Sequence, residues 1–204
     1  MRYIELFSGI GGFRRASELL SQDSGIPFDC VAFSEIDMHA LKTYKANYDI
    51  TDDTEMNDII SFADSDENVN SLADFDILMG GFPCQAFSLM GRQLGFSDER
   101  GSILFSIKKI LNIKTPEFIV LENVRHLEKH NNGDTLRNIL NFFRKNGYGF
   151  VETVVLDTKE FGLPQRRSRI FIVCSRRELD IELTQERIIN NFKNIIEHSL
   201  YIYE

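Results

Sequence analysis

Cys84 follows a proline in the segment Gly80-Gly81-Phe82-Pro83-Cys84-Gln85, where an apolar run gives way to a glycine-rich turn. Proline fixes its own φ and restricts the residue before it, so the chain that leads to the thiol is stiff. Open α/β sheets bind ligands beyond the carboxyl ends of their strands, which is where this thiol would lie. It is therefore a candidate nucleophile. The alternative is a small buried hydrophobic residue, as most free cysteines are.

The first glycine-rich turn of the chain follows the first apolar run and reads Phe7-Ser8-Gly9-Ile10-Gly11-Gly12-Phe13. Such a turn lets a ligand approach the backbone and directs the N-terminus of the next helix at a negative group. Its G-x-G-G spacing differs from the G-x-G-x-x-G of dinucleotide sites, which disfavours a nicotinamide oxidoreductase. The spacing suits a ligand with a small anionic end, such as the methionine carboxylate of S-adenosylmethionine. The alternative is a tight strand–helix connection that binds nothing.

Two acidic positions could complete this ligand site. Glu35 ends the second predicted strand, 26 residues after Gly9, and could accept hydrogen bonds from ribose hydroxyls. Asp58-Ile59 follows a third, short segment and offers a polar edge and an apolar face to an adenine ring. The alternative for Asp58 is a solvated side chain, because it lies within an acidic stretch.

The elements that must position these residues are short apolar runs separated by helical periods. Helical periods are predicted over residues 13–20, 103–111 and 136–143, and Gly147 is placed to end the last of them. Strands separated by such helices predict an α/β fold with a doubly wound, mostly parallel sheet. The predicted strands are Tyr3–Phe7, Phe28–Ile36, Phe75–Met79, Phe118–Glu122, Phe150–Leu156 and Arg169–Cys174.

The bulk composition is that of one soluble domain. The chain has 204 residues, of which 43% are hydrophobic and 26% charged. It lacks a signal-peptide h-region and any apolar run of membrane-spanning length, so we expect a cytoplasmic protein, associated with the nucleoid in a prokaryote. Three cysteines without paired spacing indicate a reducing compartment, with neither a disulfide framework nor a metal site.

The net charge of −8 is concentrated in one stretch. Ten acidic residues and no Lys or Arg lie between Asp49 and Asp76. Outside this stretch, the chain has 21 acidic and 23 basic residues. We interpret the stretch as a solvated loop region, which leaves the remaining surface free to meet phosphates.

Taken in order, the motifs resemble those of the cytosine 5-methyltransferases of DNA, over roughly the first 175 residues. The match includes the two glycine-rich turns with their flanking residues. It also includes Glu35, at the end of the second predicted strand, and Asp58-Ile59, after the third, short segment. It continues in Asp98-Glu99-Arg100-Gly101-Ser102-Ile103-Leu104-Phe105, in Glu122-Asn123-Val124 and in Gln165-Arg166-Arg167-Ser168-Arg169-Ile170.

The resemblance implies catalytic roles for four residues. Cys84 would add to carbon 6 of cytosine, so that carbon 5 can take the methyl group of S-adenosylmethionine. Glu122, a buried carboxyl with a raised pKa, would hold a proton at ring nitrogen 3. Arg169 would donate to the cytosine carbonyl, and Arg167 would steady the active-site loop or a phosphate. The alternative for Glu122 is a strand-end acid that backbone donors satisfy.

The resemblance also implies binding residues. Asn123 would order the nearby turn and backbone. Arg166 is an implied DNA contact, and the alternative is a solvated residue at the start of a strand. The target base must leave the stack of double-stranded DNA, and residues 89–99 are expected to form a mobile loop over it or a plain surface loop. The implied cofactor contacts are Phe7, Gly9, Ile10, Gly11, Gly12, Glu35, Ile36, Asp58, Ile59, Gly80 and Pro83. The implied DNA contacts are Gln85, Ser88, Arg100, Asn123 and Arg166.

The chain departs from the family after Arg177. Members continue into a target-recognition region and two further motifs, whereas 27 residues remain here. These predict an amphipathic helix with Thr184 as its cap. We therefore divide the chain into a catalytic domain, 1–178, and a helical tail, 179–204.

Two explanations of this departure stay open. The chain is either the catalytic part of a split enzyme, completed by a second polypeptide, or a truncated remnant. The alternative functions are a catalytically incomplete module that binds the cofactor or a partner, and a cytosine methyltransferase of tRNA.

Overall fold

The computed structural model describes residues 1–83 and 103–191. Its centre is one seven-stranded sheet with the order β3-β2-β1-β4-β5-β7-β6. Among the described strands, β7 runs antiparallel to both its neighbours, β5 and β6, and the other neighbouring pairs are parallel. The predicted doubly wound, mostly parallel sheet is confirmed. The strands are β1 (Arg2–Leu6), β2 (Asp29–Ser34), β3 (Thr54–Glu55), β4 (Ile77–Gly81), β5 (Phe118–Val124), β6 (Phe150–Asp157) and β7 (Ser168–Ser175).

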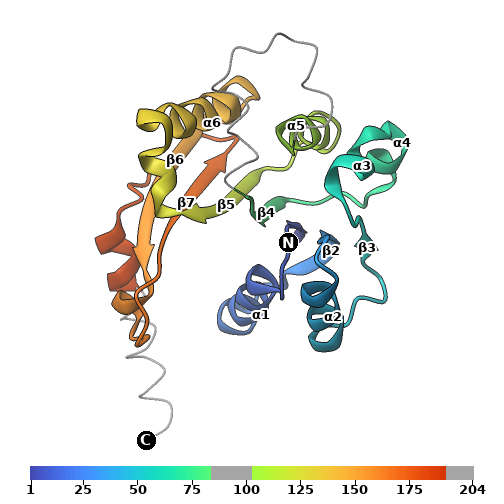
Figure 1. Cartoon of the computed structure of the whole chain (residues 1–204), viewed down its shortest axis with the longest axis horizontal. Helices are drawn as coiled ribbons and strands as arrows, with labels where there is room; N and C mark the ends of the chain where they lie inside the picture. The colour runs from blue at the N-terminus through green and yellow to red at the C-terminus, as the bar shows by residue number, and fades with distance from the viewer. Residues whose placement is uncertain (84–102, 192–204) are drawn as a thin grey trace, which may run out of the picture.

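Helices cover both faces of the sheet (Figure 1). One face carries α1 (Gly12–Ser24) and α2 (Met38–Asn47). The other face carries α3 (Ile59–Asp64), α4 (Asp66–Ser71), α5 (Ile103–Lys114) and α6 (Asp134–Lys145). The molecule is thus a three-layer α/β/α arrangement, as βαβ connections require.

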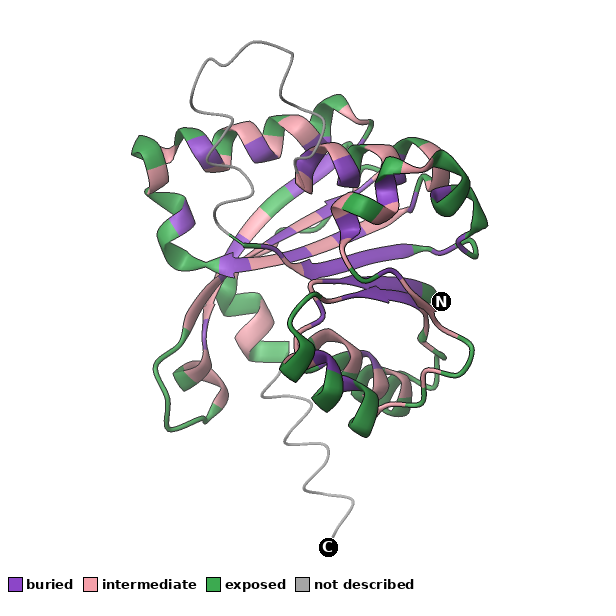
Figure 2. Cartoon of the chain, turned by 45° about the vertical axis from the view of Figure 1, so that its right-hand side comes forward, coloured by how far each residue is buried: buried purple, intermediate pink, exposed green. Residues whose placement is uncertain are grey.

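The core lies between the sheet and the second helical layer. In Figure 2 the central strands are almost continuously buried, as strands covered on both faces should be. Leu78 and Leu121 are 0% exposed and belong to one cluster with Ile107 of α5 and Phe143 of α6. Gly147, with φ +89°, follows the end of α6 as predicted.

Helix α1 packs differently from its apolar pattern. Leu19 and Leu20, which share the predicted apolar face, are 48% and 47% exposed. The helix instead contacts the sheet through Phe13, which packs near Met79, and through Ser17, whose hydroxyl lies 3.8 Å from the Met79 sulfur. The helix was predicted correctly, but its buried face was not.

The acidic stretch contains structure that its composition hides. It holds α3 and α4, which Asp58 and Ser65 cap through their side chains. Ile59 and Val69 of these helices are 3% and 0% exposed, so the expected solvated loop is wrong. Each helix has six residues, too few for an apolar period to stand out from the acidic residues.

The described chain ends in a helix that begins at residue 185. The Thr184 hydroxyl accepts a hydrogen bond of 3.2 Å from the Arg187 amide, which confirms the predicted cap. Within the described ranges, no helix has the length and apolar character that a membrane crossing needs. The same ranges contain no group of three acidic, His or Cys side chains arranged for a metal.

The two described cysteines are unsuited to nucleophilic chemistry. Cys174 is 0% exposed, and Cys30 is half-buried beneath α2. Burial raises the pKa of each thiol to about 12, so both remain protonated near neutral pH.

Candidate active site

The sheet order brings the predicted motifs to one edge. The order reverses between β1 and β4, which is where open α/β sheets bind ligands. Leu6 pairs with Gly80 across this boundary, and Gly81 pairs with Glu122 on β5. Because β7 is antiparallel, its beginning lies at the same edge, with Arg169 opposite Val124.

Glu122 and Arg169 form an ion pair at this edge. Arg169 Nε lies 2.5 Å from Glu122 Oε1, and the two side chains are 22% and 24% exposed. The other carboxylate oxygen, Oε2, lies 3.3 Å from where a Cβ on Gly81 would stand. The carboxylate thus faces the end of β4. The expectation that this carboxyl is buried is met only in part.

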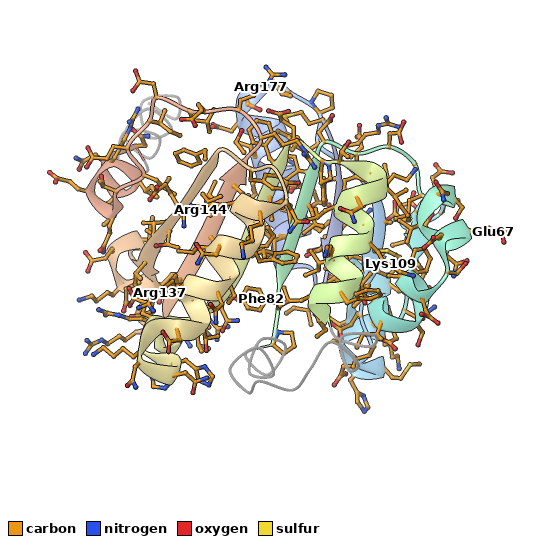
Figure 3. All side chains as sticks on the ribbon, turned by 90° about the horizontal axis from the view of Figure 1, so that it is seen from above. Glu67, Phe82, Lys109, Arg137, Arg144 and Arg177 are labelled. Atoms are coloured by element: carbon orange, nitrogen blue, oxygen red, sulfur yellow. The ribbon has the colours of Figure 1, made fainter. Side chains whose placement is uncertain are left out.

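Asn123 fixes the backbone that leads to the predicted nucleophile. It is 3% exposed, and its Nδ2 donates a 2.9 Å hydrogen bond to the Phe82 carbonyl. Its Oδ1 accepts from the Val124 amide at 2.8 Å. In the view of Figure 3, Phe82 lies at the end of β4 between α5 and α6. The predicted role in ordering the turn therefore agrees with the contacts of Asn123.

Four predicted site residues lie outside the described part of the chain. They are Cys84, Gln85, Ser88 and Arg100. Pro83, the last described residue before this gap, is exposed.

The two arginines before β7 are exposed. Arg166 Nε lies 4.0 Å from Asp157, and its side chain is 81% exposed. The Arg167 amide donates to the Thr158 hydroxyl at 3.1 Å. Because β7 begins at Ser168, Arg167 precedes the strand, whereas Arg169 lies within it.

The first glycine-rich turn is shaped by backbone contacts. Ser8 N–H donates to the Ser34 carbonyl at 2.9 Å, and Phe7 N–H donates to the Ser34 hydroxyl at 3.2 Å. Gly9 and Gly11 have φ values of +55° and +94°, which suit glycine. Phe7 also has a positive φ of 55°. The chain therefore turns sharply away from β1 before α1 begins.

Glu35 joins this turn to the one that follows β2. Its Oε2 accepts from Gly9 N–H at 2.7 Å, and its Oε1 accepts from Ile36 and Asp37 N–H, both at 2.8 Å. A carboxylate has about four acceptor positions, so one stays open for a ligand hydroxyl. Glu35 therefore holds the two turns together, and its contact with a ribose hydroxyl stays a prediction.

The predicted cofactor contacts differ in exposure. Ile36 is 74% and Ile10 64% exposed, whereas Ile59 is buried in the core. Asp58 caps α3 by accepting from the Ile60 amide at 3.1 Å and from the Ser61 hydroxyl at 2.7 Å. Partial burial by itself would raise the pKa of Asp58. The hydrogen bonds outweigh this effect, so the pKa of Asp58 is lowered. Ile36 thus offers the larger apolar surface.

Gly80 has a packing reason to be glycine. A Cβ at this position would lie 2.7 Å from the Leu6 carbonyl oxygen, inside van der Waals contact. The residue therefore permits β4 to approach β1 where their carboxyl ends meet.

Sequence reasoning missed a buried polar network beside the first turn. Arg14 donates to the Tyr44 hydroxyl at 3.1 Å, and that hydroxyl donates to Glu5 Oε2 at 3.1 Å. Arg14 also pairs with Asp53. The available signal is the pair of tyrosines at positions 44 and 48, near the end of α2, a helix that the sequence pattern does not predict.

Comparisons with known proteins identify the family of this chain. Residues 1–201 match the model of the C-5 cytosine-specific DNA methylase family. The Type II methyltransferase M.HhaI of Haemophilus parahaemolyticus is 36% identical over 182 residues, 89% of this chain and 51% of that protein. M1.ScrFI of Lactococcus lactis subsp. cremoris is 42% identical over 172 residues, 84% of this chain and 41% of that protein. The chain spans about half the length of the curated relatives it matches.

Solved structures share the fold. The Dnmt2 methyltransferase of S. pombe matches with a TM-score of 0.65 and 24% identity, over 93% of this chain and 54% of that one. A putative DNA modification methyltransferase encoded within an E. coli prophage matches with a TM-score of 0.64 and 23% identity, over 91% and 49%. The ordered motifs, the sheet and the similarity along nearly the whole chain agree, and the chain belongs to the C-5 cytosine-specific DNA methylase family.

Proposed function

We propose that this chain is the catalytic region of a DNA (cytosine-5-)-methyltransferase. It would transfer a methyl group from S-adenosylmethionine to carbon 5 of a cytosine turned out of double-stranded DNA. The observation that carries the proposal is the Glu122–Arg169 ion pair beside the end of β4, where the backbone leads to Cys84. The similarity to Type II methyltransferases supports a role in DNA modification alongside a restriction system.

The residues around the first turn fit S-adenosylmethionine. A Cβ on Gly12 would meet no atom of the described residues within 4 Å, and its φ lies outside the left-handed region. No described contact therefore requires glycine here, whereas close approach of a ligand does. Glu35 has an open acceptor position, and Ile36 exposes an apolar surface. When bound, S-adenosylmethionine supplies an electrophilic methyl group.

The protein residues would activate the cytosine ring. The Cys84 thiolate would form a bond to carbon 6 and shift electron density onto carbon 5. Glu122 would hold a proton at ring nitrogen 3, and Arg169 would donate to the adjacent carbonyl oxygen. Once carbon 5 is methylated, its proton passes to a base and the Cys84 sulfur leaves. The ring is restored, and the thiolate is regenerated.

A second polypeptide is part of the proposal. The relatives are about twice as long as this chain, so target recognition would come from residues that this chain does not include. The proposed setting is the cytoplasm, where the protein would meet DNA.

The direct test is transfer of a labelled methyl group to duplex DNA. The chain is assayed alone and with a polypeptide that carries the remaining family motifs. We expect transfer in the completed mixture and its loss in Cys84→Ala, with Cys174→Ala as the control because that thiol is buried away from the site. Transfer that survives Cys84→Ala, or is absent from every combination although cofactor binds, would reject the proposal in favour of a binding module. A tRNA acceptor, assayed in parallel, tests the choice of nucleic acid.

A further inference from the structure

The first glycine-rich turn has an open side and a filled side. A Cβ on Gly9 or Gly12 would meet no described atom within 4 Å. A Cβ on Gly11 would lie 2.2 Å from Cε2 of Tyr48, and the Tyr48 hydroxyl donates a 2.8 Å hydrogen bond to the Gly11 carbonyl. Tyr48 therefore fills the space beside Gly11, whereas no described atom fills the space beside Gly9 or Gly12.

Tyr48 is in turn held by neighbouring side chains. The Arg14 guanidinium carbon lies 5.2 Å from the centroid of the Tyr48 ring, within cation–π distance. The Tyr44 ring lies on another side, with 4.9 Å between the two ring centroids. These contacts restrict the ring to the place where it meets Gly11.

Arg14 is anchored inside the protein. It forms an ion pair with Asp53, and the two side chains are 12% and 6% exposed. It also donates to the Asp49 carbonyl at 2.5 Å and to the Tyr44 hydroxyl. That hydroxyl in turn donates a hydrogen bond to Glu5 on β1. Arg14 is thus committed to internal contacts that tie α1 to α2, to β1 and to the loop after α2.

We infer that Tyr48, held by Arg14, is a positioning residue that sets the conformation of the first glycine-rich turn for the cofactor. The inference rests on the proposed function, because it takes the open side of the turn as the cofactor side. Tyr48 would not touch the cofactor. It acts through the Gly11 carbonyl and by excluding other positions of the turn.

Tyr48→Phe tests the inference by removing a single hydroxyl. Tyr148→Phe is the matched control, because the Tyr148 hydroxyl also donates to a backbone carbonyl, that of Pro116, at 2.9 Å. Calorimetry with S-adenosylmethionine should show affinity about 3- to 10-fold weaker in Tyr48→Phe, the range expected for one hydrogen bond. The control should keep the affinity of the unchanged protein, whatever its loss of thermal stability.

A second measurement needs no ligand. Amide hydrogen exchange in a peptide that covers residues 7–13 should become faster in Tyr48→Phe and stay unchanged in Tyr148→Phe. The inference is overturned if Tyr48→Phe leaves either the affinity or the exchange unchanged, or if the control changes both equally. Failure of the unchanged protein to bind S-adenosylmethionine would count against the proposed function, and exchange alone would then decide whether Tyr48 holds the turn.

Discussion

Three glutamates of this protein occupy environments that suit different tasks. Glu122 is ion-paired with Arg169 at the edge of the sheet, with room beside Gly81. Glu35 accepts three backbone N–H groups and joins two turns. Glu5 is fully buried, and its Oε1 has no hydrogen-bond partner within the described residues. The same type of side chain therefore lies in the proposed catalytic site, between two turns and in the core.

Glu122→Gln should remove the acid from the proposed reaction. The amide keeps the size of the side chain but cannot hold a proton for ring nitrogen 3, so methyl transfer should fall by about 100-fold or more. Single-turnover transfer to duplex DNA measures the effect. Glu128→Gln is the matched control, because Glu128 pairs with Arg125 in an exposed contact. Equal rates in the two variants would contradict the assigned role.

Glu35→Gln should weaken cofactor binding and stability together. Its NH₂ group must face either Gly9 N–H or the N–H groups of Ile36 and Asp37, so at least one donor loses its acceptor. We expect a loss of about 1–2 kcal/mol in the free energy of unfolding and a clear loss of affinity for S-adenosylmethionine. Urea denaturation and calorimetry measure the two effects.

Asp37→Asn provides the comparison for Glu35→Gln. One oxygen of Asp37 accepts from both His39 and Ala40 N–H, and an asparagine carbonyl can do the same. The Asp37 variant should therefore keep both stability and affinity. If Glu35→Gln behaved like it, the hydrogen bonds of Glu35 would not be holding the two turns.

At the scale of elements, the sequence predicts those helices and strands whose apolar pattern extends over enough residues. The apolar runs of β4 and β5 and the periodic faces of α5 and α6 each carry several buried residues. The two-residue strand β3 and the six-residue helices α3 and α4 do not, so they were missed. The exposure of Leu19 could not be foreseen, because the pattern of α1 does not say which neighbours are present to cover it.

The site was predictable as far as its motifs are contiguous. Glu122, Asn123 and Arg169 lie in short segments that resemble the family, and the sheet brings them together. The Arg14 network joins residues that are 30 to 39 positions apart and belong to elements that the pattern left undefined. Its partners could be found only from the packing of α1 against α2.

Lys114 should anchor the end of α5 to the segment before β4. Its Nζ donates to the carbonyls of Asn70 and Leu72, at 3.0 and 2.5 Å, and its side chain is 9% exposed. Lys114→Met leaves both carbonyls without this donor, which should lower the free energy of unfolding by about 1–3 kcal/mol. Urea denaturation checks this against Lys108→Met on the exposed side of the same helix. Similar losses in both variants would show that the contacts of Lys114 contribute little.

For the whole molecule, the sheet divides the proposed chemistry between two halves. Beyond β1 and β2 lie the turn and Glu35, which would bind the cofactor. At the same edge, β5 and β7 carry Glu122 and Arg169, which would act on cytosine. At the boundary between β1 and β4, a Cβ on Gly80 would lie 2.7 Å from the Leu6 carbonyl oxygen, so glycine is needed for this approach. The stability of this boundary therefore bears on both halves. Glu5, a buried carboxyl of β1, directly precedes Leu6, which pairs with Gly80 across the boundary.

Glu5 should make the stability of the whole molecule depend on pH. Burial, partly offset by the Tyr44 hydroxyl and by Arg14 and Phe13 N–H, raises the pKa of Glu5 from 4.5 to about 7. Between these values the folded protein keeps a proton that the unfolded chain releases. The free energy of unfolding should therefore fall, by on the order of 3 kcal/mol, as pH rises through this window. Nearby Tyr3, Tyr44 and Cys30, whose pKa values burial raises, stay neutral throughout. Urea denaturation at pH 5 to 8 should show this fall in the unchanged protein relative to Glu5→Gln, which cannot ionise, and parallel curves would contradict the assignment.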